Sequence, residues 1–285
     1  MKRRARRNGQ VFLSGIVPIY NPGMHRLTRQ VRFAINGEND LQLAQKPTNG
    51  YGGFPSIARF GPFLSIEVTL SGPIDPVSSY LINIKQIDAI VRERAIPVVA
   101  EAVLSKAEAP ARLVGRLFEM LEAWPPLTLE RLSLNLSPFL SYSTQVSERP
   151  MIRVSQKFEF SATHRLHNPK MGKSENSRIF GKCNNPHGHG HNYEVEVTLK
   201  GEPDGNGVLI GIPEFERIVG QMVIERFDHK NLNVELKEFA ELIPTVENIA
   251  MVIYRMLKPG FSSNHAGLAS VTVWETPKTW CEYSE

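Results

Sequence analysis

The stretch YEVEVTLKG, Tyr193 to Gly201, has a close counterpart in LSIEVTLSG, Leu64 to Gly72. In both stretches apolar residues alternate with polar ones, and each run ends at a glycine followed by a proline-containing turn. Alternation with a period of two predicts a strand with one buried face, because successive side chains of a strand point to opposite faces. The stretches are 129 residues apart (193 minus 64), and this offset predicts an internal repeat.

The segments that follow the two strands also correspond. Residues 80–101 parallel residues 208–228, and each segment predicts a short strand leading into an amphipathic helix. A second helix is expected at residues 111–123 in the first half, and at residues 244–257, PTVENIAMVIYRML, in the second. The two halves therefore share one order of elements.

Each half is expected to close on alternating strands, residues 132–142 and residues 270–283. This order predicts an α+β protein built from two tandem repeats, each with a four-stranded antiparallel sheet carrying two helices on one face. The predicted division of the chain is a basic mobile tail at residues 1–10, a first repeat at 11–148 and a second repeat at 149–285.

Composition limits the classes of protein to consider. Apolar content of 41% and charged content of 22% are typical of a globular protein, and no apolar run approaches the ~18 residues that span a bilayer. We therefore expect a cytoplasmic protein without a membrane partner. Two cysteines are too few to staple 285 residues. The basic run at residues 2–7 predicts a solvated tail, with nucleic acid not the main partner.

The two halves differ where chemistry is expected. Seven of the eight histidines lie between residues 164 and 265. Under the 129-residue offset, His189 and His191 fall opposite Phe60 and Pro62, whose side chains cannot bind a metal. The first repeat is therefore predicted to be a scaffold without a metal site.

The run GKCNNPHGHGHNY, residues 181–193, predicts a metal centre in the second repeat. In a strand, His189 and His191 project to the same face, and the glycine between them allows close approach. The expected third ligand is His164, at the end of a strand that begins near residue 152. Three histidines leave a fourth zinc position open, as catalytic sites require. His187 leaves the alternative pair His187 and His189 open.

Four further residues are candidates for proton transfer and binding. The Cys183 thiol precedes the histidine strand, and a thiol near a metal can ionise and act as a base. Asp228 and His229 are adjacent, and such a pair can fix a histidine tautomer and relay a proton. Glu275 is the one carboxylate in an alternating apolar strand, where it could hold a flat, amidine-like ring edge through two hydrogen bonds.

Five separated motifs of the second half now support a resemblance. In order and spacing they resemble the 6-pyruvoyltetrahydropterin synthase family, which includes the related 6-carboxytetrahydropterin synthases of queuosine biosynthesis. The motifs are FSATHRLHNP, GKCNNPHGHGHNYEVEVTLKG, FDHKNLN, PTVENIA and the final ET strand. The resemblance implies the tunnelling fold, in which small sheets join side by side into a barrel with sites between neighbouring subunits.

The resemblance also implies roles for individual residues. Zinc is implied on His164, His189 and His191, with Cys183 as proton acceptor. Asp228 and His229 are implied as the relay of Cys183, and Glu275 as the anchor of the pterin ring. The helix in PTVENIA adds Thr245, a suitable N-cap, and Glu247, in the first turn, which we assign with Glu275 to substrate binding.

The implied reaction is a zinc-dependent lyase reaction on 7,8-dihydroneopterin triphosphate. Loss of triphosphate gives 6-pyruvoyltetrahydropterin, and cleavage of the side chain gives the 6-carboxy product. The sequence leaves both products open, and Mg²⁺ could assist with the triphosphate. Two positions depart from the family pattern: Gly211 stands where Asp or Asn is usual, and Val246 where Thr or Ser is common. Neither is a proposed zinc ligand.

A fused tandem raises a question about assembly. If complete and empty repeats alternated around one ring, a site shared between neighbours would lose half its groups. We therefore expect a homo-oligomer in which second repeats meet second repeats and first repeats form a supporting layer. Two rival functions are a non-catalytic pterin-binding or assembly protein and a metal-storage or metal-sensing module. The complete residue set disfavours the first rival, and the scarcity of cysteine disfavours the second.

Overall fold

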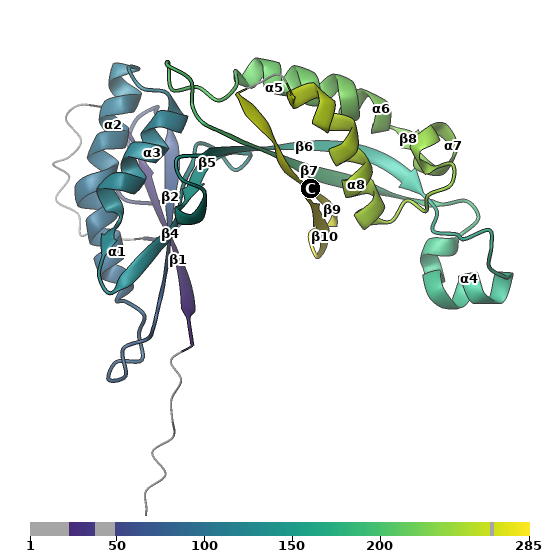
Figure 1. Cartoon of the computed structure of the whole chain (residues 1–285), viewed down its shortest axis with the longest axis horizontal. Coiled ribbons are helices and arrows are strands. Elements are labelled where there is room, and N and C mark those ends of the chain that lie inside the picture. Colours follow the sequence, from purple (N-terminus) through teal and green to yellow (C-terminus); the bar gives the residue numbers. More distant parts are fainter. Residues whose placement is uncertain (1–22, 38–48, 263–264) are drawn as a thin grey trace, which may run out of the picture.

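The computed structural model describes residues 23–37, 49–262 and 265–285, so the predicted basic tail at residues 1–10 lies outside the described residues. Figure 1 shows a bent molecule in which the two halves of the chain lie side by side, with helices on the outer side of the bend. Here "first half" means the described residues up to 148, and "second half" those from 149 onward. No helix in the described ranges is both long and apolar enough to cross a membrane.

One sheet of ten strands runs through both halves. Its main path is β1-β2-β4-β5-β6-β7-β9-β10, with the short strands β3 and β8 paired to β4 and β6. The strands of the first half are β1 (His25–Ala34), β2 (Phe63–Gly72), β3 (Ala123–Trp124), β4 (Leu127–Asn135) and β5 (Leu140–Gln145). Those of the second half are β6 (Ile152–His164), β7 (His189–Gly201), β8 (Lys230–Asn231), β9 (Ala266–Thr276) and β10 (Thr279–Tyr283).

The helices of each half fall between its second strand and its closing strands, apart from α4 (Lys173–Phe180), which lies in the β6–β7 connection. Each half begins its helical layer with a helix that contains a five-residue π segment. The first-half elements are α1 (Ile84–Ile90), η2 (Val91–Ala95), α2 (Ile96–Ser105) and α3 (Pro110–Leu121). The second-half elements are α5 (Ile212–Val219), η5 (Gly220–Ile224), α6 (Glu225–Phe227), α7 (Leu232–Glu235) and α8 (Val246–Leu257).

The two strands predicted from the alternating stretches at residues 64–72 and 193–201 are β2 and the body of β7. The apolar side chains of both point into the core: Ile66, Val68 and Leu70 are fully buried, as are Val195, Val197 and Leu199. Their partners correspond too, since β1 pairs Phe33 with Leu64 and β6 pairs Phe160 with Tyr193. Period-two alternation therefore located both strands and the face that each one buries.

The expectation of two separate four-stranded sheets is wrong. β5 pairs with β6 from Leu140 opposite Gln156 to Ser143 opposite Arg153, and this short ladder joins the halves into one ten-stranded sheet. The alternating pattern shows which residues form strands. It does not show whether the edge strands of the two halves pair with each other. The unpaired N–H and C=O groups of two adjacent edges satisfy one another across the junction.

The short strands predicted just before the helices are also absent. Residues 80–83 and 208–211 form bends that lead directly into α1 and α5. Leu209 and Ile210 are nevertheless buried in the core. These residues are apolar because they are buried, although they form no strand. Over so short a run, periodicity does not distinguish a strand from another buried segment.

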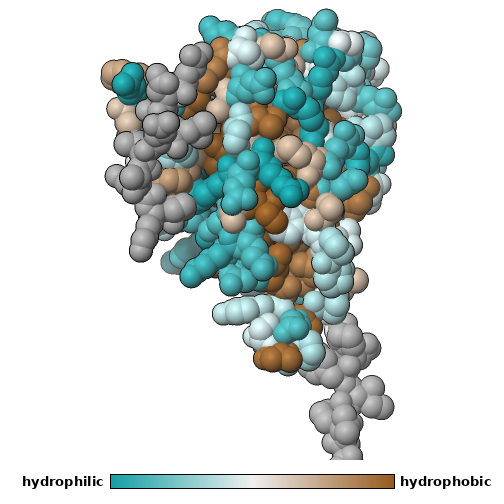
Figure 2. Space-filling model, turned by 90° about the vertical axis from the view of Figure 1, so that its left-hand side faces the viewer, coloured by the Kyte–Doolittle hydropathy of each residue, from teal (hydrophilic) through white to brown (hydrophobic). Residues whose placement is uncertain are grey.

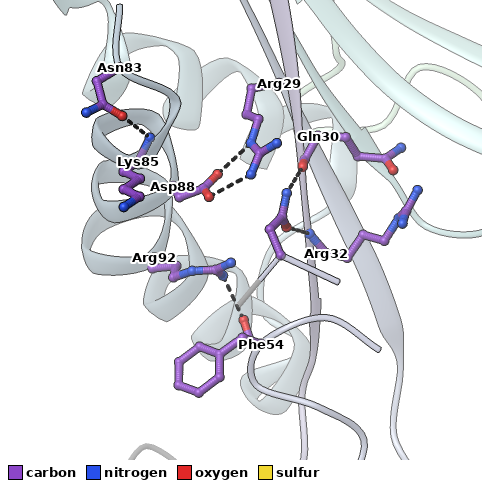
Figure 3. A network of polar contacts seen from close by, with 9 residues as sticks. Arg29, Gln30, Arg32, Phe54, Asn83, Lys85, Asp88 and Arg92 are labelled. Atoms are coloured by element: carbon purple, nitrogen blue, oxygen red, sulfur yellow. Dashed lines mark hydrogen bonds and ion pairs between the residues drawn. The ribbon is translucent and has the colours of Figure 1, made fainter. Parts of the chain in front are cut away.

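A polar network fastens the first-half helix to the sheet (Figure 3). Arg29 of β1 donates two hydrogen bonds of 2.8 Å to the Asp88 carboxylate of α1. Beside this pair, Arg92 of η2 donates to the Phe54 carbonyl at 3.0 Å. The fork of two parallel bonds gives directional specificity as well as attraction.

Figure 2 views this end of the molecule, where hydrophilic side chains cover most of the surface and hydrophobic patches lie between them.

The connection between the halves is fixed by Glu148. Its carboxylate accepts two hydrogen bonds from Arg153 of β6 at 2.6 and 2.7 Å and contacts Lys200 of β7 at 3.0 Å. The Arg153 bonds, aided by Lys200, lower the pKa of Glu148 to about 2, although partial burial opposes this. The pair therefore ties the junction to both long strands of the second half.

Replacing Glu148 with glutamine is expected to lower the free energy of unfolding at pH 7 by about 1–2 kcal/mol. A carboxyl whose pKa is lower in the folded state stabilises the fold above its unfolded pKa and loses this effect as pH falls through the folded one. The difference between wild type and Glu148→Gln should thus shrink between pH 4.5 and about 2. Urea unfolding across this range measures it, and a difference independent of pH would contradict the assignment.

Candidate metal centre and active site

Three histidines meet at the open end of the β6–β7 pair. The register places His164 opposite His189, and Ala162 opposite His191, so all three imidazoles lie on one face of the sheet. Their potential ligand nitrogens lie within 4.8 Å of one another. Gly188, at φ +72°, makes the turn into β7, and a Cβ there would lie 3.0 Å from the His164 carbonyl oxygen. The turn thus requires glycine directly before the first histidine of the pair.

The hydrogen bonds of these histidines leave ring nitrogens available to bind a metal. The Nδ1 of fully buried His164 lies 2.7 Å from the Pro244 carbonyl, to which it donates, and this leaves a lone pair on Nε2. That Nε2 lies 3.1 Å from Nε2 of His189. Among the described residues, His189 Nδ1 and His191 Nε2 are buried without a hydrogen-bond partner. Three histidines that each bring one ring nitrogen within 4.8 Å of the others suit a cation.

The pKa values favour neutral imidazoles. Burial lowers the pKa of His164 to about 4; the neighbouring His189 and His191 contribute, while the Pro244 carbonyl opposes the shift. Burial likewise lowers the pKa of His191, against the opposing carboxylate of Glu275. A neutral imidazole is the form that binds a metal, so His164 and His191 can bind one at neutral pH without losing protons first.

Glu275 of β9 closes one side of the cluster. Its Oε1 lies 3.3 Å from His164 Nε2 and 3.6 Å from His191 Nε2. The same carboxylate lines a cavity of about 710 Å³ together with His191, Tyr193 and Trp274. A cavity of this size accommodates a bicyclic ring with a side chain. Glu275 and His191 of the histidine cluster therefore line one cavity.

Cys183 lies in η4 (Gly181–Asn184), between α4 and β7. The Cys183 carbonyl accepts a 2.9 Å bond from the Leu166 N–H, which ties the cysteine to the residues just after His164. Burial raises the pKa of Tyr193 above its usual range, and the neighbouring Glu275 and Cys183 add to the effect. Both groups therefore act electrostatically on the Tyr193 hydroxyl.

The Asn176 side chain fixes the turn at residues 168–172, in the connection that also contains Cys183. This side chain is fully buried and makes four hydrogen bonds to backbone groups. Its Oδ1 accepts from the Asn168 N–H at 2.8 Å, and its Nδ2 donates to the carbonyls of Asn168, Met171 and Gly172 at 2.9–3.2 Å. A single amide thus satisfies the backbone of a turn that has no ladder of its own.

Replacing Asn176 with alanine should remove these four hydrogen bonds and cost about 2–4 kcal/mol of stability. The loop should also loosen, so that Cys183 reacts faster with an alkylating reagent than it does in the wild type. The other cysteine, Cys281 of β10, serves as an internal control whose rate should not change. Equal rates at Cys183 in the variant and the wild type would show that Asn176 does not hold the cysteine loop.

Asp228 and His229 lie at the outer edge of β6. The Asp228 Oδ1 accepts from the Ser161 N–H at 2.9 Å, and the His229 N–H donates to the Ser161 carbonyl at 2.6 Å. His229 Nδ1 donates to Asp228 Oδ2 at 2.8 Å, and the Ser161 and His229 bonds lower the pKa of Asp228. His229 has φ +58°, a left-handed conformation that is costly for a residue with a side chain. This pair of residues thus holds Nε2 of an exposed imidazole toward solvent.

The structure brings some predicted residues together and leaves others apart. His164, His189, His191 and Glu275 share one cluster. In the described part of the chain, the Asp228–His229 pair hydrogen-bonds to Ser161 and not to Cys183.

The remaining candidates surround this arrangement. The Thr245 hydroxyl accepts from the Asn248 N–H at 3.4 Å and caps α8, with Glu247 in its first turn. His187 lies outside the three-histidine cluster, and its N–H donates to Asn185 Oδ1. Gly211 precedes α5 without a side-chain cap, and Val246 is buried at the start of α8.

Sequence reasoning missed three contributors to the site. These are the Tyr193 ring, the Asn176 clamp and the Pro244 carbonyl that orients His164. Tyr193 could have been found, because it continues the alternation of His189 and His191 on the same face. The other two depend on a loop conformation that no periodic pattern encodes.

The second half of the chain is similar to known proteins. The family model described as 6-pyruvoyl tetrahydropterin synthase matches residues 153–285. The 6-pyruvoyl tetrahydrobiopterin synthase of Drosophila melanogaster is 38% identical over 139 residues, covering 48% of this chain and 82% of the relative. The human protein of that name is 40% identical over 111 residues, covering 39% of this chain and 77% of the relative.

Other similar proteins include a solved structure and a second kind of synthase. The structure of Caenorhabditis elegans 6-pyruvoyl tetrahydropterin synthase is 36% identical and has a TM-score of 0.45, covering 48% of this chain and 96% of that one. A 6-carboxy-5,6,7,8-tetrahydropterin synthase from Haemophilus influenzae is 26% identical over 156 residues, 47% of this chain and its whole length. On its match to these relatives, the chain belongs to the 6-pyruvoyl tetrahydropterin synthase family.

Proposed function

We propose that this chain is a zinc-dependent lyase that converts 7,8-dihydroneopterin triphosphate to 6-pyruvoyltetrahydropterin with release of triphosphate. The observation that carries the proposal is the clustering of three histidines with the Glu275 carboxylate, of which His191 and Glu275 line one cavity. A zinc ion held by His164, His189 and His191 would supply Lewis acidity to side-chain oxygens of the substrate. Mg²⁺ with the triphosphate is a further expectation.

The other residues of the site are proposed to bind and move protons. Glu275 anchors the pterin ring by accepting hydrogen bonds from its amidine-like edge. Thr245 and Glu247, at the start of α8, are proposed to take part in substrate binding. Cys183 accepts the proton that leaves the substrate side chain. Asp228 fixes the His229 tautomer through a 2.8 Å bond, so that Nε2 is free to take up and return that proton.

The relay is proposed to act between chains. His229 is 83% exposed, and its pair with Asp228 lies at the edge of β6 rather than beside the Cys183 of its own chain. We propose a homo-oligomer in which this exposed relay serves the Cys183 of a neighbouring chain. The two halves already lie side by side in one sheet, so a supporting layer of first halves would have to form through contacts between chains.

The tandem organisation is part of the proposal. We propose a first repeat at residues 11–148 and a catalytic repeat at 149–285, descended from one tunnelling-fold unit. The matching order of elements, the equal register of β1–β2 and β6–β7 and the π segments η2 and η5 support this. The first repeat is proposed to be a scaffold without metal, since Phe60 and Pro62 stand where the second has histidines.

The 6-carboxy product of queuosine biosynthesis is the alternative. The Drosophila and human relatives, at 38% and 40% identity, carry the pyruvoyl name, whereas the Haemophilus relative with the carboxy name is 26% identical. This difference favours the pyruvoyl product. Incubating the zinc-loaded protein with 7,8-dihydroneopterin triphosphate and identifying the product by mass tests both. A 6-carboxy product would select the alternative, and no turnover would refute the lyase.

A further inference from the structure

Tyr193 has a buried hydroxyl without a partner. The residue is 0% exposed, and its Oη has no hydrogen-bond acceptor or donor among the described residues. Its ring stacks on Phe160 at 4.9 Å and meets His191 and His164 edge-on, at 5.5 and 6.0 Å between ring centroids. The ring therefore packs fully, while its polar atom is left unsatisfied.

An unpaired buried hydroxyl is costly. Removing a hydroxyl from water without a compensating hydrogen bond is unfavourable in a folded protein. Phenylalanine would keep the ring contacts and avoid this cost. The hydroxyl therefore gives the fold no evident advantage, and a group that enters the site is the natural partner for it.

The first half provides an internal comparison. Leu64 occupies the equivalent register position, opposite Phe33 as Tyr193 is opposite Phe160, and it is 4% exposed. The same registers make Leu136 the counterpart of Glu275, because Asn135 pairs with Ser65 as Trp274 pairs with Glu194. Where the histidines and the carboxylate are missing, the hydroxyl is missing too. The strand packs without it.

The position of the hydroxyl defines what it can reach. Tyr193 lines the same cavity of about 710 Å³ as Glu275 and His191. Glu275 Oε1 lies 3.6 Å from His191 Nε2, and the Tyr193 ring lies 5.5 Å from that of His191, so a ligand that contacts Glu275 and His191 would lie beside Tyr193. A neutral phenol there can donate one hydrogen bond to an oxygen.

We propose that the Tyr193 hydroxyl is a substrate-contacting group that donates a hydrogen bond to an oxygen of the bound reduced pterin, beside Glu275 and the histidine cluster. This inference rests on the proposed function and deepens it. The contact orients the pterin side chain so that its reacting carbon faces Cys183, and stability of the fold is not its purpose.

The test compares Tyr193→Phe with Tyr254→Phe, a matched loss of a buried tyrosine hydroxyl in α8, where Oη contacts the Leu268 carbonyl at 3.5 Å. Four quantities are measured: melting temperature, zinc per chain, binding of 7,8-dihydroneopterin, and kcat and KM. Tyr193→Phe should keep the wild-type zinc content, melt at the wild-type temperature or above it, bind 7,8-dihydroneopterin more weakly and lose about tenfold or more in kcat/KM. Tyr254→Phe should keep the wild-type kcat/KM.

Three results separate the possibilities. A kcat/KM of Tyr193→Phe within about twofold of the wild type, with unchanged pterin binding, overturns the inference. Loss of zinc in step with activity also overturns it, because the hydroxyl would then support only the metal centre. A wild-type protein that binds zinc but turns over no substrate refutes the proposed function, and is recognised before any variant is compared.

Discussion

Replacing His191 with alanine is expected to remove the metal and, with it, all measurable turnover. The buried Nε2 of His191 has no other hydrogen-bond partner among the described residues, and two histidines cannot hold a catalytic zinc ion as three do. Groups that only orient metal ligands already contribute about 10–100-fold in affinity, so loss of a ligand should exceed that range. Zinc per chain, measured by elemental analysis, should fall from one to near zero.

His187→Ala is the matched control, because His187 lies two residues before the cluster and outside it. A bound metal stabilises the folded state by mass action. A chelator should therefore lower the melting temperature of the wild type and of His187→Ala but leave that of His191→Ala unchanged. Full zinc content in His191→Ala would contradict the three-histidine centre.

Replacing Cys183 with alanine is expected to lower kcat by about 10²–10⁴-fold while leaving the zinc content unchanged, since positioned general bases contribute on that scale. Cys281→Ala is the matched control and should retain wild-type kcat. Cys281 is the second cysteine of the chain and lies on β10, paired with Val273. Equal kcat for Cys183→Ala and the wild type would remove the cysteine from the mechanism.

Mixed oligomers test whether the Asp228–His229 relay serves the Cys183 of its own chain or of a neighbouring chain. A Cys183→Ala chain retains its Asp228–His229 pair, and a His229→Ala chain retains its cysteine. If the relay acts between chains, co-expression should restore about a quarter of the wild-type activity, because each of the two contributions is intact in half the chains of a symmetric assembly. No restoration from two folded, zinc-loaded variants would show that each site is made within one chain.

The sequence predicted those features that periodicity and residue type encode. Alternation located β2 and β7, and the two-residue spacing of His189 and His191 placed their side chains on one face. It could not predict the β5–β6 ladder, because pairing between edges depends on how the whole sheet bends. The position of the Asp228–His229 pair depends on a left-handed residue that is not glycine, and no pattern signals that conformation.

The two ends of the sheet are unlike: β1 has ten residues and β10 has five. The two edges of the sheet can therefore be told apart. Contacts between like edges and contacts between unlike edges have different symmetries. Contact between unlike ends is heterologous, and repeats until a ring closes or a filament grows. Contact between like ends is isologous and stops at a pair. Pairing through β10 would bring two histidine-bearing halves together, whereas pairing through β1 would join two scaffold halves and leave the catalytic ones at opposite poles.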